Sequence, residues 1–173
     1  MLTALGWGLS LASPSVALAA APGAPQFLLN LPGCGSFKKG GNSSQNAYSF
    51  CDIVVGTGPV VEAGELIEVE YVATAVSTGS VFESSRNFRF TLGQDEVIPG
   101  WEAGILGLKA SDSAPELESI PPMREGGARS VIIPASLAYG ARGSTCLFGD
   151  PSKCRVPPGS DVEVVFRYRG MVQ

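Results

Sequence analysis

Histidine is absent from the 173-residue chain, which excludes Ser-His-Asp and Cys-His nucleophilic sites and every metal site that needs an imidazole ligand. Charged residues are scarce, at 16% of the chain, and the formal net charge is −4. We expect no nucleic-acid partner, because phosphate backbones are bound by basic surfaces. The sequence contains neither a complete G-x-x-x-x-G-K-[ST] motif nor a G-x-G-x-x-G motif, and we expect no cofactor.

Charge is missing altogether from the first 37 residues. Residues 1–21 form an apolar run that ends in Ala19-Ala20-Ala21, and small residues after an apolar stretch are typical of a cleaved signal. A membrane-spanning helix is the alternative, since the length just permits one, but Pro14 and the small-residue end favour cleavage. Because no basic residues precede the run, we expect residues 1–21 to be the final part of a longer targeting sequence.

Glycine and proline are abundant, with 22 and 13 residues, which suits a turn-rich domain built mostly of strands. Residues 22–50 are rich in Gly, Pro, Ser and Asn and show little periodicity, so we expect a flexible N-terminal arm there. The sequence predicts a folded domain over residues 51–173, because clear apolar periods begin after this arm.

Apolar residues alternate with polar ones over 67–73, 88–92 and 162–169, which predicts three half-buried strands. Further strands are expected at 81–82, after a turn at 78–79, and at 128–133, where Pro134 ends the run. The period changes at Trp101, Ile105 and Leu108, which predicts a short helix that begins at Pro99. Residues 109–122 are predicted to be a loop. The expected fold is an α+β domain, an antiparallel sheet wrapped on one short α-helix.

Four cysteines follow the apolar run: Cys34, Cys51, Cys146 and Cys154. They allow three disulfide pairings, and the sequence alone does not choose among them. Pairing of neighbours along the chain would close two small loops in Gly-rich and Pro-rich segments, where crosslinks suppress fraying. A zinc site is the alternative, but no C-x-x-C spacing supports it. We therefore expect two disulfides and a compartment outside the reducing cytosol.

Several short motifs carry a resemblance to a known family. Residues 92–104 (LGQDEVIPGWEAG) closely resemble the helix-start motif of the FKBP-type immunophilins, which are peptidyl-prolyl cis/trans isomerases. Residues 69–71 (VEY), 81–85 (VFESS), 138–141 (AYGA) and 156–158 (VPP) resemble further motifs of that family in the family's order. The resemblance covers roughly residues 65–170 and implies a curved antiparallel sheet around one short helix, with isomerase activity.

The resemblance also implies a site. The proline ring of a substrate would lie over Trp101, the backbone N–H of Ile98 and the hydroxyl of Tyr139 would hold its carbonyls, and the Glu83 carboxylate would lie beside the twisted amide. From composition alone, Trp101 would be a core residue and Glu83 a solvated turn residue. The full set of implied site residues is Tyr71, Phe82, Glu83, Phe88, Val97, Ile98, Trp101, Tyr139, Val156 and Val164.

The chain departs from the family pattern at the site. Glu83 stands where the family usually has Asp, Val164 where an aromatic residue is usual, and Arg155 where an aliphatic one is usual. We expect a weak to moderate isomerase and weakened binding of a macrolide ligand. The alternative is a binding or chaperone module that holds a partner during assembly. The loop at 111–119 would add surface to such a module, although a neutral insertion explains that loop more simply.

The positions of the cysteines are similar to those in the immunophilins of the chloroplast thylakoid lumen, which implies the disulfides Cys34–Cys51 and Cys146–Cys154. The thylakoid lumen is therefore the expected compartment, with the endoplasmic reticulum or secretion second. The implied partners are proline-containing peptides or proteins. We expect a monomer that is not bound to a membrane once the signal is removed.

Overall fold

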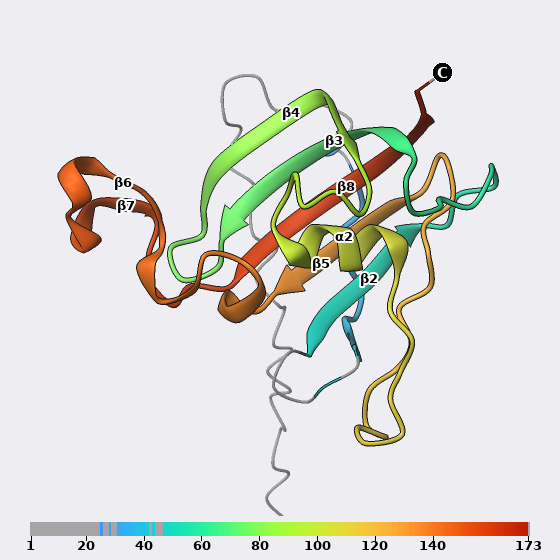
Figure 1. Cartoon of the computed structure of the whole chain (residues 1–173), viewed down its shortest axis with the longest axis horizontal. Helices are drawn as coiled ribbons and strands as arrows, with labels where there is room; N and C mark the ends of the chain where they lie inside the picture. The colour runs from blue at the N-terminus through green and yellow to red at the C-terminus, as the bar shows by residue number, and fades with distance from the viewer. Residues whose placement is uncertain (1–24, 26–27, 29–30, 42, 44–46, 173) are drawn as a thin grey trace, which may run out of the picture.

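The computed structural model describes residues 25, 28, 31–41, 43 and 47–172, so the expected signal segment at 1–21 lies outside them. Six strands form one antiparallel sheet in the order β1-β2-β5-β8-β3-β4, and β6 and β7 form a hairpin of their own. Helix α2 lies over one face of the sheet (Figure 1). Within the described residues, no helix combines the length and the apolar character needed to cross a membrane.

The elements have the following bounds: β1 Lys38–Gly40, β2 Tyr48–Val54, β3 Leu66–Ala75, β4 Ser80–Thr91, α2 Pro99–Leu106, β5 Ala128–Ile133, β6 Ser144–Cys146, β7 Cys154–Val156 and β8 Val162–Met171. Short 3₁₀ turns lie between β5 and β7. The expected α+β fold, an antiparallel sheet with a short helix, is confirmed. The strand predicted at 128–133 has the expected bounds, and the alternation at 162–169 lies within β8.

Helix α2 packs closely on β5 because two of its residues have no side chain. Gly100 and Gly104 are four residues apart, so they share one face of the helix. A Cβ atom at Gly100 would overlap Cγ2 of Ile133, and one at Gly104 would lie 3.2 Å from Cγ2 of Val131. These two glycines therefore set how closely the helix approaches the sheet, and with it the position of the neighbouring Trp101.

We expect Gly100→Ala to lower the free energy of unfolding by roughly 1–3 kcal/mol through overpacking against Ile133. Alanine has the higher helix propensity, by about 1 kcal/mol, so helix propensity alone predicts the opposite sign. Gly104→Ala is the matched variant, with a smaller expected cost because its Cβ has more room. Urea unfolding measures both, and a neutral or stabilising Gly100→Ala would contradict the close contact.

Strand β4 corrects one expectation from the sequence. Two separate strands were expected at 81–82 and 88–92, but Ser80–Thr91 is a single strand that pairs with β3. The polar residues at 83–87 interrupt the hydrophobic alternation without ending the strand, because backbone pairing with β3 continues. The register shifts twice along this pair, between Val69 and Tyr71 and between Ala73 and Thr74.

The end of α2 differs from the expectation as well. Leu108 was expected on the helix, but α2 ends at Leu106, and Gly107 follows with a φ of 81°. Leu108 instead exchanges two backbone hydrogen bonds with Ile120, with N–O distances of 2.9 and 2.8 Å. This bridge closes the base of the loop expected at 109–122.

The N-terminal arm expected at 22–50 is wrong for its described second half. Strand β1 pairs with β2, and β2 pairs with β5 in the interior of the sheet. Tyr48 and Phe50 are each only 3% exposed. The expected domain boundary at residue 51 therefore falls inside β2. The pairing partner of β2 is distant along the chain, so no local periodic pattern in the sequence predicts this strand.

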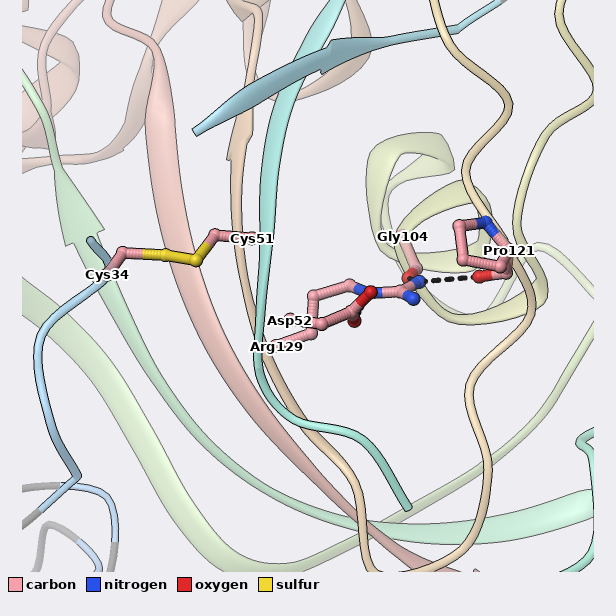
Figure 2. A network of polar contacts seen from close by, with 6 residues as sticks. All are labelled: Cys34, Cys51, Asp52, Gly104, Pro121 and Arg129. Atoms are coloured by element: carbon pink, nitrogen blue, oxygen red, sulfur yellow. Dashed lines mark hydrogen bonds and ion pairs between the residues drawn. A yellow bond between two sulfur atoms is a disulfide. The ribbon is translucent and has the colours of Figure 1, made fainter. Parts of the chain in front are cut away.

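Arg129 on β5 is 2% exposed and joins several parts of the fold (Figure 2). Its Nε donates to Oδ1 of Asp52 on β2 at 2.6 Å, and its Nη1 donates to the carbonyls of Gly104 and Pro121 at 2.8 Å each. Cys51, next to Asp52, is bonded to Cys34. The arginine thus connects β2 to the C-terminal half of α2 and to the loop that follows the helix.

Candidate active site

Trp101 lies in the first turn of α2, directly after an extended segment. Pro99 occupies the start of the helix, where its fixed φ is favourable, and Ile98 before it is extended, with φ −60° and ψ 144°. The indole is 5% exposed. Its centroid lies 4.5 to 6.3 Å from those of four aromatic rings: Tyr71, Phe88, Phe90 and Phe166. Edge-to-face contacts of this kind add about 0.5–1.5 kcal/mol each beyond burial, so the indole is held firmly in place.

The polar groups of Tyr71, Glu83 and Tyr139 lie together beside these rings, and we call them the polar corner. Burial raises the pKa of the Tyr139 hydroxyl, and the negative charge of Glu83 raises it further. The pKa of Tyr71 is raised mainly by burial, then by the charge of Glu83 and by a hydrogen bond with it. Both hydroxyls therefore stay protonated at neutral pH and can donate hydrogen bonds. Glu83 itself is exposed, so the corner combines one anionic group with two hydroxyls beside an apolar surface.

The structure brings the sequence-predicted site residues together. Five of them belong to the buried core cluster, and four more pack against its edge: Tyr71, Phe82, Trp101, Val156 and Val164, then Phe88, Val97, Ile98 and Tyr139. Glu83 is the tenth and lies beside the two tyrosines. The rings of Phe82 and Tyr139 meet edge to face at 5.8 Å.

Val156 and Val164 differ from the other predicted site residues because both are 0% exposed. Val164 lies opposite Ala73 of β3 and Val131 of β5 in the sheet. Neither valine presents surface to a ligand. Both support the site from within the core, whereas the partly buried residues at its edge provide accessible apolar surface.

Sequence reasoning left Phe90 and Phe166 out of the site, although both rings contact Trp101. Phe90 shares a strand face with the predicted Phe88, so period-two alternation could have found it. Phe166 lies opposite Tyr71 in the register of β8 with β3. That neighbour relation appears only when two distant strands are paired, so the sequence held no local signal for Phe166.

Both disulfides join neighbours along the chain. Cys34 is bonded to Cys51, and Cys146 to Cys154, which confirms the pairing that the resemblance implied. All four cysteines are thereby used, which leaves no thiolate for the alternative zinc site. The second disulfide links β6 to β7, and the last residue of β7, Val156, belongs to the same core cluster as Trp101.

Comparison with known proteins extends these observations. The model of the FKBP-type peptidyl-prolyl cis-trans isomerase family matches residues 58–166. The chain is 42% identical over 130 residues to the chloroplastic peptidyl-prolyl cis-trans isomerase FKBP13 of Arabidopsis thaliana, covering 70% of this chain and 56% of that protein. It is 34% identical over 135 residues to the chloroplastic photosynthetic NDH subunit of lumenal location 4 of the same plant, covering 73% of this chain and 56% of that protein.

A solved structure agrees with the sequence comparisons. The crystal structure of AtFKBP13 superimposes with a TM-score of 0.65 and 38% identity, covering 79% of this chain and 99% of that one. The chain spans just over half the length of the two Arabidopsis relatives. The matched family region includes Trp101, both tyrosines of the polar corner and Glu83. The chain belongs to the FKBP-type peptidyl-prolyl cis-trans isomerase family.

Proposed function

We propose that this chain is a peptidyl-prolyl cis/trans isomerase that acts on proline-containing polypeptides at the surface around Trp101. The observation that carries the proposal is the combination of a ring-held indole with the polar corner of Tyr71, Glu83 and Tyr139. The edge residues Phe88, Val97 and Ile98 are half-buried, so they offer an apolar surface that a proline ring can contact.

The chemistry requires no nucleophile or metal, because no bond breaks. Rotation about the peptide C–N bond faces a barrier of about 18–20 kcal/mol that arises from amide resonance, and uncatalysed prolyl isomerisation takes tens to hundreds of seconds. Water stabilises the planar, charge-separated amide by hydrogen bonds to its oxygen. An apolar site that removes this water disfavours the planar form and thereby favours the twisted transition state.

We infer that two groups orient the substrate. The Ile98 N–H lies at the start of α2, where helices leave backbone N–H groups without partners, and within the described residues it donates to no backbone carbonyl. The Tyr139 hydroxyl stays protonated. We assign both groups to substrate carbonyls, and the Glu83 carboxylate to the side of the twisted amide, where charge separation changes during rotation.

The proposed compartment is the thylakoid lumen, where the protein would assist folding or assembly of lumenal proteins. Two disulfides indicate a location outside a reducing compartment. The two Arabidopsis relatives carry chloroplastic names, and one name includes a lumenal location. The expected cleaved segment at 1–21 belongs to the same proposal.

A second candidate function is a binding module with little catalysis. One relative is named as a subunit of a larger assembly, not as an isomerase. In this chain Glu83 is one methylene longer than the aspartate usual in the family, which changes where the carboxylate lies. The same apolar surface would then hold a proline-containing segment of a partner without accelerating its isomerisation.

A prolyl isomerisation assay separates the two functions. The oxidised chain from residue 22 onward is assayed on a tetrapeptide with one X-Pro bond, before and after reduction with dithiothreitol. Catalysis by the oxidised protein supports the isomerase. Its loss on reduction would make the disulfides necessary for the active fold. A folded, oxidised protein that binds the tetrapeptide without accelerating its isomerisation would favour the binding module.

We expect Glu83→Gln to lower kcat/KM on the tetrapeptide about tenfold, equivalent to 1.4 kcal/mol of transition-state stabilisation. It should also lower the pKa of Tyr139, because the negative charge that helps to raise it is removed. Enzyme kinetics and an ultraviolet tyrosine titration measure the two effects. Asp112→Asn is the matched control, since it removes a carboxylate from the exposed loop. Equal kinetics of wild type and Glu83→Gln would show that the Glu83 carboxylate takes no part in catalysis.

A further inference from the structure

A small pocket lies between the end of β2 and the loop that follows α2, and it shares no residue with the candidate active site. Its volume is about 140 Å³, enough for about five groups of the size of a water molecule, whose share of liquid volume is about 30 Å³. Asp52 and Arg129 supply polar groups to the pocket. Much of the remaining wall is apolar and comes from Val54, Val55, Pro121, Pro122 and Met123.

The guanidinium of Arg129 is held in a fixed orientation at this pocket (Figure 2). Its side chain is 2% exposed, Nε and Nη1 make the three hydrogen bonds described above, and its central carbon lies 5.7 Å from the centroid of the Phe50 ring. The third nitrogen, Nη2, has no hydrogen-bond partner in the described part of the chain, and it is not fully enclosed. Nη2 therefore offers N–H donors to the pocket.

The Asp52 carboxylate provides an acceptor close to this donor. Its Oδ1 accepts from Nε of Arg129, whereas its Oδ2 accepts no hydrogen bond from the residues that the structure describes. The Asp52 side chain is 28% exposed, so Oδ2 is open to a ligand. Because the two residues form one ion pair, the pocket offers a donor and an acceptor side by side.

The charges at the pocket disfavour an acidic ligand. The guanidinium of Arg129 and the carboxylate of Asp52 largely cancel each other. Arg124 also lines the pocket, but its Nη1 donates to the carbonyl of Gly58, which lies outside the lining, at 3.3 Å. A carboxylate ligand would bond to Nη2 but would be repelled by Asp52. A primary carboxamide has an acceptor oxygen and N–H donors, so it can bond to Nη2 and Oδ2 together.

We propose that this pocket is a second binding site, which receives the side-chain carboxamide of a glutamine from a partner polypeptide. The amide oxygen accepts from Nη2 of Arg129, one amide N–H donates to Oδ2 of Asp52, and the short stem contacts the apolar wall. Val54 and Val55 are 40% and 73% exposed, so they extend an apolar surface that residues beside the glutamine can cover. The inference does not depend on isomerase activity, because none of the catalytic groups takes part.

The test compares three peptides without proline. They are acetyl-Leu-Gln-Leu-N-methylamide and its analogues with Glu or Met in place of Gln, titrated into the isotope-labelled, oxidised protein and followed by NMR. We expect the glutamine peptide to shift the amide signals of Val55 and Gly127, which line the pocket. The Glu and Met peptides should bind at least about tenfold more weakly, because each loses hydrogen bonds that the pocket offers. Propionamide should also bind at least about tenfold more weakly, because it leaves the apolar surface uncovered.

Asp52→Asn gives the sharpest result. Asparagine keeps an oxygen for Nε of Arg129 but replaces the other oxygen with an NH₂ group, so the pocket then offers donors only. We expect the preference to reverse, with the Glu peptide binding at least about fivefold more tightly than the Gln peptide. Val55→Ser should weaken the Gln peptide about threefold without changing the preference. Val76→Ser is the control, since this exposed valine follows β3 at the opposite end of the sheet, and it should have no effect.

Several results would overturn the inference. The wild type might bind the Gln peptide no more tightly than the Met peptide, or not at all at millimolar concentration. Shifts confined to the indole of Trp101 and the amide of Ile98 would place the binding at the candidate active site instead. Propionamide binding as tightly as the peptide would exclude a polypeptide partner. A folded Asp52→Asn protein that keeps the wild-type order of the three peptides would exclude Oδ2 as the acceptor.

Discussion

Replacing Trp101 with leucine is expected to lower kcat/KM on a prolyl tetrapeptide by about 10- to 100-fold, equivalent to roughly 1.4–2.8 kcal/mol of transition-state stabilisation. The indole forms the rigid base of the proposed site, and four surrounding rings fix its position. Leucine is smaller and can change rotamer, so it neither covers a proline ring nor excludes water from the amide to the same degree. Tetrapeptide kinetics with the oxidised protein measure the loss.

Trp101 is also a core residue at 5% exposure, so the variant will lose stability as well as activity. The large-to-small change and the lost ring contacts predict a cost of about 2–4 kcal/mol. Ile105→Val is the matched control, one turn further along α2 and fully buried. It should cost about 0.5–1.5 kcal/mol and leave kcat/KM unchanged. A folded Trp101→Leu protein with wild-type kinetics would place the catalytic surface elsewhere.

Elements with their own periodic pattern could be predicted from the sequence. The strand at 128–133 and the alternation at 162–169 depend on a two-residue period that a half-buried strand imposes locally. The start of α2 is set by Pro99, which lies in its first turn. The residues that the family resemblance implied come together in space, because they lie on β3, β4, the start of α2, the segment after β5, β7 and β8.

Other features depend on contacts between residues far apart in the chain, and no local pattern encodes them. Strand β2 was missed because its partner is β5, and Phe166 because its relation to Trp101 requires the pairing of β8 with β3. Arg129 sits in a strand whose apolar pattern gives no sign of a buried charge. Its partners Asp52 and Gly104 become neighbours only when the sheet and helix are assembled.

Arg129→Met is expected to lower the free energy of unfolding by about 2–5 kcal/mol, because it removes three hydrogen bonds of a buried side chain, although Asp52 keeps 28% of its own side chain exposed to water. The Gly104 carbonyl explains why the loss is large. Its ordinary helical donor would be the N–H of Leu108, which instead bonds to Ile120. Arg129 supplies the missing donor to Gly104 and another to Pro121. Methionine fills the space but leaves these two carbonyls without that donor, at about 1–3 kcal/mol for each buried group.

Urea unfolding of Arg129→Met should show a lower midpoint with an unchanged m-value, since the same surface is exposed on unfolding. Arg89→Met is the matched control. Its Nε lies 2.8 Å from Glu68, much as Arg129 lies 2.6 Å from Asp52, but the Arg89 side chain is 56% exposed against 2% for Arg129. A surface pair contributes about 0–1 kcal/mol, so the control should cost little. Similar losses in the two variants would mean that burial adds nothing to the Arg129 contacts.

Arg129 also acts on the helix that carries Trp101. Its positive charge lies at the C-terminal half of α2, where a cation interacts favourably with the helix dipole, and its bonds hold that half against β2 and the following loop. Arg129→Lys keeps the charge but lacks the planar fork that serves several acceptors at once. It should therefore recover only part of the lost stability. Full recovery by lysine would assign the effect to charge alone, whereas partial recovery assigns it to the three directed hydrogen bonds that fix α2 on the sheet.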